Sequence, residues 1–257
     1  YHVLKDKFPE KETWYIKDVN EVIEKYREEL GASKFKNDFF GEKATDSFNR
    51  ITEWARENEA GHEKDVYMTH VDVDNMKDEM VYCILVDTVH KRIVVVIRGT
   101  ETYFGGTGML HNVLSDIRAY KTKEDLPEAL SGKPDGGIKH VWLHKGFHSY
   151  LNRKTKKGQD GAEITAKEEM LMYVMREVKK HPDYTVCCTG HSLGASLSTL
   201  AAYYLALDDK IPKPVNNINF QSPRLGDTFF LKTCRYLEEK GDLQICRFAN
   251  NNDQIAN

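Results

Sequence analysis

The sequence predicts an α/β protein in which a mostly parallel central sheet is flanked by helices. The first observation is the segment order after residue 140, where apolar strand-like runs alternate with amphipathic helical segments. The second is the run IVVVI at residues 93–97, which is apolar at every position, as expected for a strand covered on both faces. The third is a strand, a sharp turn at Ser192 and a helix within residues 184–200.

Composition excludes several classes of function. The 257 residues suit one domain, residues 1–257, with enough apolar side chains for a sizeable core. The 37 basic and 40 acidic residues create no overall field that would attract nucleic acid, so we expect no such partner. No apolar run approaches the ~18 residues that an integral membrane span needs. Metal-ligand spacings and phosphate-binding loops are missing, so we expect neither metal nor cofactor.

The cysteines and the first residue bear on the compartment. Cys187 and Cys188 precede the turn and are read as small buried residues. Cys234 and Cys246 could pair in an oxidising compartment, and spacing leaves that open. The chain begins at Tyr1 without Met or an apolar leader, so we expect a processed chain or a fragment and make no prediction of compartment.

Residues 1–65 are strongly charged and carry two helical patterns, at residues 19–30 and 43–60. Amphipathic helices of this kind pack on a sheet. We therefore expect a charged helical N-terminal cover without chemistry of its own.

The apolar runs at residues 81–86 and 93–97 predict two strands joined by a turn. If residues 93–97 lie beside the strand that precedes Ser192, Thr100 leaves the sheet at the same edge as Ser192. The backbone N–H groups of Thr100 and Leu193 could then form an oxyanion hole.

Residues 101–115 combine a glycine-rich hinge with a short apolar face. One interpretation is a loop that ends in a buried helical turn. The other is a lid, a mobile cover whose apolar side lies over a site in water and turns toward lipid at an interface. The apolar residues of this lid are Phe104, Met109, Leu110, Val113 and Leu114.

The next segments are expected to be structural. Residues 121–137 are polar and rich in Pro and Gly, which predicts a surface excursion. His144 and His148 lie near the core by pattern and are interpreted as satisfied structural histidines. Residues 162–180 have apolar positions at helical spacing and predict a helix.

Gly190-His191-Ser192-Leu193-Gly194 is the candidate catalytic motif. A serine on a sharp strand-to-helix turn is the arrangement of a nucleophile elbow, and the flanking glycines allow close backbone approach. The alternative is an ordinary N-cap serine whose glycines only permit a tight turn. The context favours a nucleophile.

A serine hydroxyl needs an imidazole to accept its proton, and the imidazole needs a carboxylate to orient it. Strands are expected at residues 215–220 and 243–248, with a helix at 227–240 between them. Asp253 follows the last strand and is the predicted acid; Asp227 and Asp242 are weaker rivals.

No histidine follows Asp253, although hydrolases with this elbow place the histidine after the acid. Three explanations remain open. A C-terminal piece after Asn257 that carries the histidine is favoured over a rearranged site using His144 or His111, and over a catalytically dead relative.

Five ordered blocks resemble the class 3 lipase family, the fungal-type triacylglycerol lipases with their plant and algal relatives. The resemblance covers about residues 80–257. The blocks are IRGT at 97–100, LHKGF at 143–147, GHSLGA at 190–195, SPRLG at 222–226 and NDQI at 252–255.

The resemblance implies an α/β-hydrolase fold, Ser192 as nucleophile, Asp253 as acid, Thr100 and Leu193 as oxyanion donors, and a lid just after Thr100. Gln221 stands where the family has glycine, and Ala256 where proline is common.

The expected activity is hydrolysis of acylglycerol esters through an acyl-enzyme, with lipid at a membrane or droplet interface as the partner. The alternatives are a phospholipase, a galactolipase, a feruloyl-type esterase, or a non-catalytic scaffold of the same fold.

Overall fold

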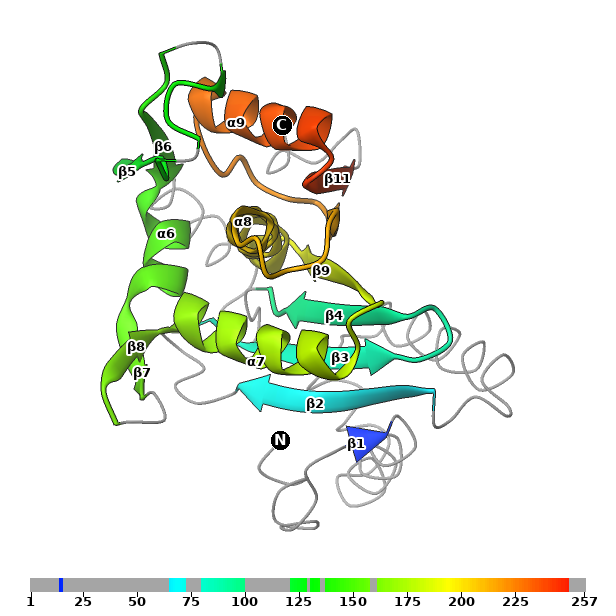
Figure 1. The fold of residues 1–257 in the computed structure, drawn as a ribbon. Coiled ribbons are helices and arrows are strands. Elements are labelled where there is room, and N and C mark those ends of the chain that lie inside the picture. Colours follow the sequence, from blue (N-terminus) through cyan, green and yellow to red (C-terminus); the bar gives the residue numbers. More distant parts are fainter. Residues whose placement is uncertain are drawn as a thin grey trace.

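The computed structural model describes residues 14–15, 65–72, 80–99, 121–128, 130–134, 137–157 and 161–249. Within them a seven-stranded sheet has the order β1-β2-β3-β4-β9-β10-β11 (Figure 1). Its strands are β1 (Trp14–Tyr15), β2 (Val66–Asp72), β3 (Tyr82–Asp87), β4 (Arg92–Ile97), β9 (Thr185–His191), β10 (Val215–Phe220) and β11 (Leu243–Phe248). Strands β4, β9, β10 and β11 are mutually parallel, and β1 to β4 pair antiparallel. The predicted fold class is confirmed.

The helices are α6 (Lys145–Asn152), α7 (Ala166–Lys180), α8 (Leu193–Leu207) and α9 (Thr228–Lys240). Two small sheets accompany them, β5 (Lys121–Asp125) with β6 (His140–His144) and β7 (Lys154–Lys157) with β8 (Glu163–Thr165). Except for Asp65 and β1, the predicted N-terminal cover lies outside the described residues.

Two predicted segments differ from the structure. Residues 121–125, within the segment predicted as a surface excursion, form the regular strand β5, which pairs antiparallel with β6. The helix predicted from residue 162 begins at Ala166, because residues 163–165 form β8. Thr165 then caps α7: its hydroxyl accepts from the Glu168 N–H, and the Glu168 carboxylate accepts from the Thr165 N–H. This reciprocal capping box fixes the helix start.

The structure meets the condition that the sequence left open for the strand beside the elbow strand. β4 pairs parallel with β9, and Ile97 lies opposite Gly190 at the end of the pairing. β4 is buried on one face through Ile93, Val95 and Ile97. Its other face, with Val94 and Val96, is only half-buried in the described part of the chain. The prediction that both faces of this strand are fully covered, made because every residue of the run is apolar, is therefore wrong for the second face.

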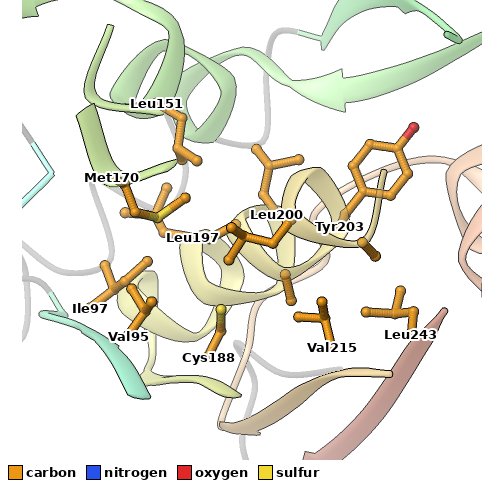
Figure 2. Packing of buried hydrophobic residues seen from close by; sticks show 14 of the residues in the cluster. Val95, Ile97, Leu151, Met170, Cys188, Leu197, Leu200, Tyr203, Val215 and Leu243 are labelled. Atoms are coloured by element: carbon orange, nitrogen blue, oxygen red, sulfur yellow. The ribbon is translucent and has the colours of Figure 1, made fainter. Parts of the chain in front are cut away.

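The core lies between α8 and the sheet (Figure 2). Leu197 and Leu200 of α8 are buried against residues of β4, β9 and β10. The remaining labelled core side chains come from α6, α7, α8 and strands β4, β9, β10 and β11: Val95, Ile97, Leu151, Met170, Cys188, Tyr203, Val215 and Leu243. Burying each large apolar side chain contributes about 1.5–3 kcal/mol. This packing holds α8 directly behind the turn at Ser192.

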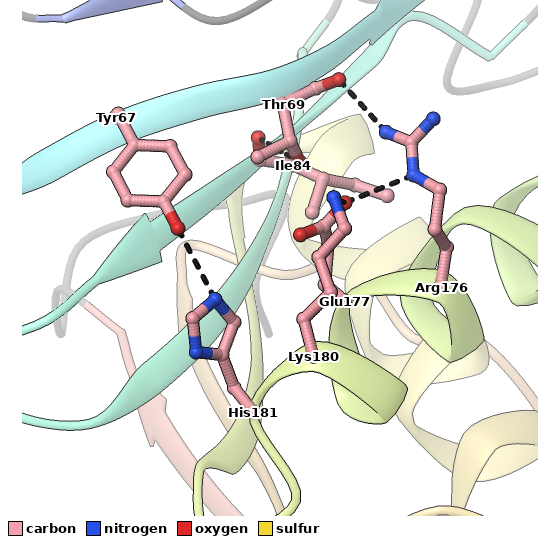
Figure 3. Close-up of polar contacts among 7 residues, drawn as sticks. All are labelled: Tyr67, Thr69, Ile84, Arg176, Glu177, Lys180 and His181. Carbon is pink, nitrogen blue, oxygen red and sulfur yellow. Dashed lines mark hydrogen bonds and ion pairs between the residues drawn. The ribbon is translucent and has the colours of Figure 1, made fainter.

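Polar contacts join β2 to α7 at the other end of the sheet (Figure 3). The Tyr67 hydroxyl lies 3.1 Å from His181 Nε2, and Arg176 donates to the Thr69 carbonyl at 3.1 Å. Arg176 also bonds the buried Glu177, which Lys180 approaches at 3.1 Å. These contacts attach an outer strand to the helical layer.

Candidate active site

Ser192 occupies the turn between β9 and α8 with φ 54° and ψ −121°. Positive φ is rare for a residue with a side chain and costs of order 1–3 kcal/mol unless its surroundings enforce it. The extended run of β9 delivers the chain into this turn, and α8 begins at the next residue. The local geometry is therefore the strained strand-to-helix bend that the GHSLG motif predicts.

The glycines of the motif permit this bend because the surrounding backbone comes very close. A Cβ on Gly190 would collide with the carbonyl of Gly194, and a Cβ on Gly194 would collide with the carbonyl of Ile97. A Cβ on Gly99 would lie 2.7 Å from the His191 carbonyl oxygen. The turn is thus pressed against the end of β4, the strand that leads to Thr100.

Backbone hydrogen bonds hold the turn in place. The Ser192 N–H donates to the Phe220 carbonyl of β10 at 3.0 Å. The Ala195 and Ser196 N–H groups donate back to the Ser192 carbonyl at 3.0 Å and 3.3 Å. Nothing among the described residues accepts from the Leu193 N–H, which lies in the first turn of α8. That donor, at the positive end of the helix dipole, can receive an anionic oxygen.

The other predicted site residues fall outside the described residues. They are Thr100, Asp253 and the lid residues Phe104, Met109, Leu110, Val113 and Leu114. The elements that lead to two of them are described. Gly99 lies against the elbow. At the ends of the parallel strands, Phe220 of β10 lies between His191 of β9 and Phe248 of β11. The chain therefore enters both segments at the sheet edge that carries Ser192.

Histidines within the described residues do not form a hydrogen bond with Ser192. His144 ends β6 and is buried, and neither of its ring nitrogens has a partner in the described structure. Burial lowers the pKa of His144, and the positive charge of Lys121 adds to the shift. The sequence predicted a structural histidine whose ring nitrogens are hydrogen-bonded, and for His144 the hydrogen-bonding part of that prediction is wrong within the described structure. His148 instead lies 3.4 Å from the Glu124 carboxylate.

Two features of the site region were not predicted, or were predicted only in part, from the sequence. Gln221 has φ 55°, the left-handed conformation that favours glycine, which explains why glycine is usual there. Asn217 and Asn219 face α8 from β10 and are fully buried, whereas the sequence indicated only a strand. The available signal was the presence of three asparagines within the strand-like segment VNNINF.

Cysteine, metal and membrane features add little to the site. Cys234 and Cys246 are both free thiols. The described residues contain no cluster of three or more potential metal ligands. Among the helices that the structure describes, none has the length and hydrophobicity to span a bilayer.

The family profile described as Lipase (class 3) matches residues 94–257, which include β4, the elbow and the strands after it. The chain belongs to the class 3 lipase family. Its structural neighbours show the α/β-hydrolase fold. A Yarrowia lipolytica lipase superposes with a TM-score of 0.56 at 19% identity, covering 77% of this chain and 62% of that one. A triacylglycerol lipase of Penicillium expansum gives 0.54 at 20% identity, covering 75% and 63%.

The curated relatives of this class 3 lipase chain include plant enzymes. A chloroplastic galactolipase of Arabidopsis thaliana is 30% identical over 172 residues, which cover 64% of this chain and 33% of that protein. A chloroplastic phospholipase A(1) of the same plant is 41% identical over 156 residues, covering 60% and 32%. The chain thus spans about a third of the length of these relatives.

Proposed function

We propose that the chain carries the nucleophile of a serine hydrolase that cleaves carboxylic esters of glycerolipids. The observation that supports this most is the strained conformation of Ser192 beside the Leu193 N–H at the start of α8, which has no acceptor among the described residues. A plain N-cap serine would have extended backbone and bond the N–H groups of the first turn through its side chain. Ser192 has positive φ and makes no side-chain cap.

The proposed reaction proceeds through an acyl-enzyme. Ser192 Oγ forms a bond to the ester carbonyl carbon while its proton passes to an imidazole oriented by Asp253. The carbonyl oxygen becomes an oxyanion that accepts hydrogen bonds from the N–H groups of Leu193 and Thr100. Collapse breaks the ester C–O bond, and the leaving alcohol takes the proton. Water then attacks the acyl group by the same route and releases the fatty acid.

The names of the relatives bear on the substrate. Sequence alone favours acylglycerols, whereas the plant relatives at 30% and 41% identity are named a galactolipase and a phospholipase. The triacylglycerol lipases resemble this chain at about 20% identity, which supports the fold only. We therefore propose that the preferred substrate is a glycerolipid with a polar head group.

The nucleophile is tested by labelling the full-length natural protein with a fluorophosphonate probe. Wild type should be labelled at Ser192, and Ser192→Ala should lose the label together with ester turnover by a factor on the order of 10⁴ to 10⁶. Ser131→Ala, a serine in an exposed turn, is the matched control and should behave as wild type. Absence of both label and hydrolysis in folded wild type would instead favour a non-catalytic scaffold.

The substrate is tested on a panel of phosphatidylcholine, monogalactosyldiacylglycerol, triacylglycerol and a feruloyl ester. Polar glycerolipids should be cleaved with the highest kcat/KM. A clear preference for triacylglycerol or for the feruloyl ester would overturn this part of the proposal.

The lid is a proposal as well, since residues 101–115 lie outside the described residues. A mobile apolar cover predicts that the hydrolysis rate rises when a soluble ester passes into micelles. An unchanged rate across the critical micelle concentration would contradict it.

A further inference from the structure

Polar side chains occupy the interface between α8 and the sheet, where apolar packing would be expected. Asn217 and Asn219 of β10 are 0% and 1% exposed, and both face the helix. Asparagine is disfavoured in strands, and a buried amide is costly unless its hydrogen bonds are satisfied. The polar residues of α8 and of the loop after β10 that meet this region are Ser196, Ser198, Thr199 and Ser222.

Asn217 is the centre of this network. Its Nδ2 donates to the Cys188 carbonyl of β9 at 3.1 Å and to Ser198 Oγ at 3.0 Å. Its Oδ1 accepts from Thr199 Oγ1 at 3.0 Å and from Asn219 Nδ2 at 2.7 Å. One amide therefore joins β9, β10 and α8, and uses all of its ordinary donor and acceptor capacity.

The helix side of the network begins in its first turn. The hydroxyls of Ser198 and Thr199 lie 2.9 Å from the Ala195 carbonyl as well as against Asn217. Ser196 donates to the Pro223 carbonyl at 3.0 Å and lies 3.1 Å from the Ser222 hydroxyl. The turns that follow Ser192 are thus tied both to β10 and to the loop after it.

The network is not arranged for greatest stability. Within the described structure, Asn219 Oδ1 is buried without a hydrogen-bond partner. An unsatisfied buried oxygen costs stability, and an apolar residue would avoid the cost. Such local departures are typical of sites where function constrains the structure.

Directional hydrogen bonds can fix the position of α8 along its axis more strictly than apolar packing does. Leu197 and Leu200 hold α8 against the sheet, but the small side chains beside them, Ala195, Ala201 and Ala202, offer few features that resist a slide along the helix axis. The four hydrogen bonds of the Asn217 side chain are directional, and together they favour a single register of α8 on the sheet. Because α8 starts at Leu193, any shift of the helix moves Ser192 Oγ and the Leu193 N–H together.

We propose that Asn217 is a positioning residue that fixes the register of α8 on β10 and so keeps Ser192 and the Leu193 N–H aligned with the reacting carbonyl. This inference rests on the proposed function. An oxyanion donor is effective at about 2.7–3.1 Å, and a displacement of about 1 Å can cost on the order of 10²-fold in rate. Asn217 itself touches no substrate.

The test compares Asn217→Leu with Asn216→Leu in the full-length protein. The two changes are chemically the same and lie on the same strand, but Asn216 faces away from α8, and within the described structure its side chain donates to the Pro214 carbonyl at 3.4 Å. Asn217→Leu should lower kcat about tenfold or more with KM within about twofold, because alignment acts on the chemical step. Asn216→Leu should keep both constants within about twofold of wild type.

A second measurement separates alignment from loss of folded protein. The rate constant of fluorophosphonate labelling per folded molecule, measured well below the unfolding transition, should fall in parallel with kcat. Thr199→Val supplies an independent route to the same network should Asn217→Leu fold poorly. If Thr199 acts through Asn217, the double variant should lose little more activity than Asn217→Leu alone.

The outcomes distinguish the two levels of the proposal. If wild type is active and both Asn217→Leu and Thr199→Val keep wild-type kcat and labelling rate, the positioning role is overturned and the hydrolase stands. Fully additive losses in the double variant would likewise contradict the network. If wild type neither hydrolyses glycerolipids nor takes the label, both proposals fall.

Discussion

At the scale of single residues, the candidate site depends on two positions being glycine, which has no side chain. The Ser192 turn exists because Gly190 and Gly194 let backbone carbonyls approach where a Cβ would collide. The crowding involves main-chain atoms of β4 and α8, which cannot move aside as a flexible side chain can. Strain at Ser192 is therefore maintained by the surrounding sheet and helix.

Replacing Gly194 by alanine should be strongly destabilising. The new Cβ would overlap the Ile97 and Arg98 backbone, so α8 would have to move away from β4. We expect a loss of about 3 kcal/mol or more in the free energy of unfolding, measured by urea denaturation. Gly137→Ala is the matched control, because its Cβ would meet nothing within 4 Å and should change stability by less than about 0.5 kcal/mol. Equal effects would show that backbone crowding is not the cause.

The residues that sequence could predict are those whose chemistry is local. The pentapeptide around Ser192 predicts the strand-to-helix turn by itself. Gln221 could be singled out because the family usually has glycine at that position. Asn217 gave little warning, because its partners Ser198 and Thr199 become neighbours only when α8 packs on β10. The missing partners of His144 also depend on tertiary packing.

At the scale of elements, helix starts are decided by caps as well as by apolar periodicity. The periodic pattern of α7 extends back to residue 162, yet the helix begins only after Thr165, where the capping box satisfies the first N–H groups. β5 was missed for a related reason: its sequence KTKED is polar, and its strand conformation comes from pairing with β6.

Thr165→Ala should destabilise the protein by about 1 kcal/mol, within the range of about 0.5–2 kcal/mol for lost N-caps. The hydroxyl that accepts from the Glu168 N–H at 3.1 Å is removed, and that donor loses its partner. Thr165→Ser keeps the hydroxyl and should stay within a few tenths of a kcal/mol of wild type. Thermal unfolding of the three proteins would measure this, and a serine variant as unstable as the alanine variant would contradict the cap.

The contact among β5, α6 and α8 should respond to pH. Burial by itself would raise the pKa of Glu124, but hydrogen bonds from His148 and from Tyr204, whose hydroxyl lies 2.6 Å away, lower that pKa below its ordinary value. A carboxyl with a lowered folded pKa stabilises the fold fully above its unfolded pKa, about 4.3, and loses this as the pH falls through the folded value.

Glu124→Gln should therefore be less stable than wild type near neutral pH, and the difference should vanish at acid pH. Denaturant unfolding between about pH 7 and pH 3 would measure it. Glu128→Gln, a change in an exposed turn, is the control and should follow wild type at every pH. A difference that persists at the acid end would mean that the charge of Glu124 is not its source.

At the scale of the whole molecule, stability should be greatest around the elbow strand. β9 is paired on both sides, with β4 and β10, and α8 covers it. β11 has β10 as its only strand neighbour in the described sheet, and Phe248 near its end is 52% exposed. Strands that open easily are those with few buried contacts.

Hydrogen exchange followed by mass spectrometry should therefore show slower exchange in β9 than in β11. Peptides from residues 185–191 and 243–248 can be compared within one sample, which serves as its own control. Equal protection of the two strands would indicate that β11 is covered by some part of the protein outside the described residues.

The architecture as a whole was predicted more readily than its edges. The parallel order after residue 140 follows from alternating strands and helices, whereas the pairing of β4 with β9 was only a condition in the sequence and is supplied by the structure. The half-buried second face of β4 could not be predicted. Apolar residues allow both faces of a strand to be buried, but they do not show whether another element packs on each face.

The parallel pairing of β4 with β9 has a consequence for synthesis on the ribosome. Arg92 lies opposite Thr185, so the apolar strand leaves the exit tunnel long before the partner that will complete its hydrogen bonds. Long-range parallel pairing is slow, and an unpaired apolar strand is prone to intermolecular association in the meantime. Among the described strands, β3 is the one that can pair with β4 during that interval, so yield in a foreign host should depend on translation speed and on chaperone supply.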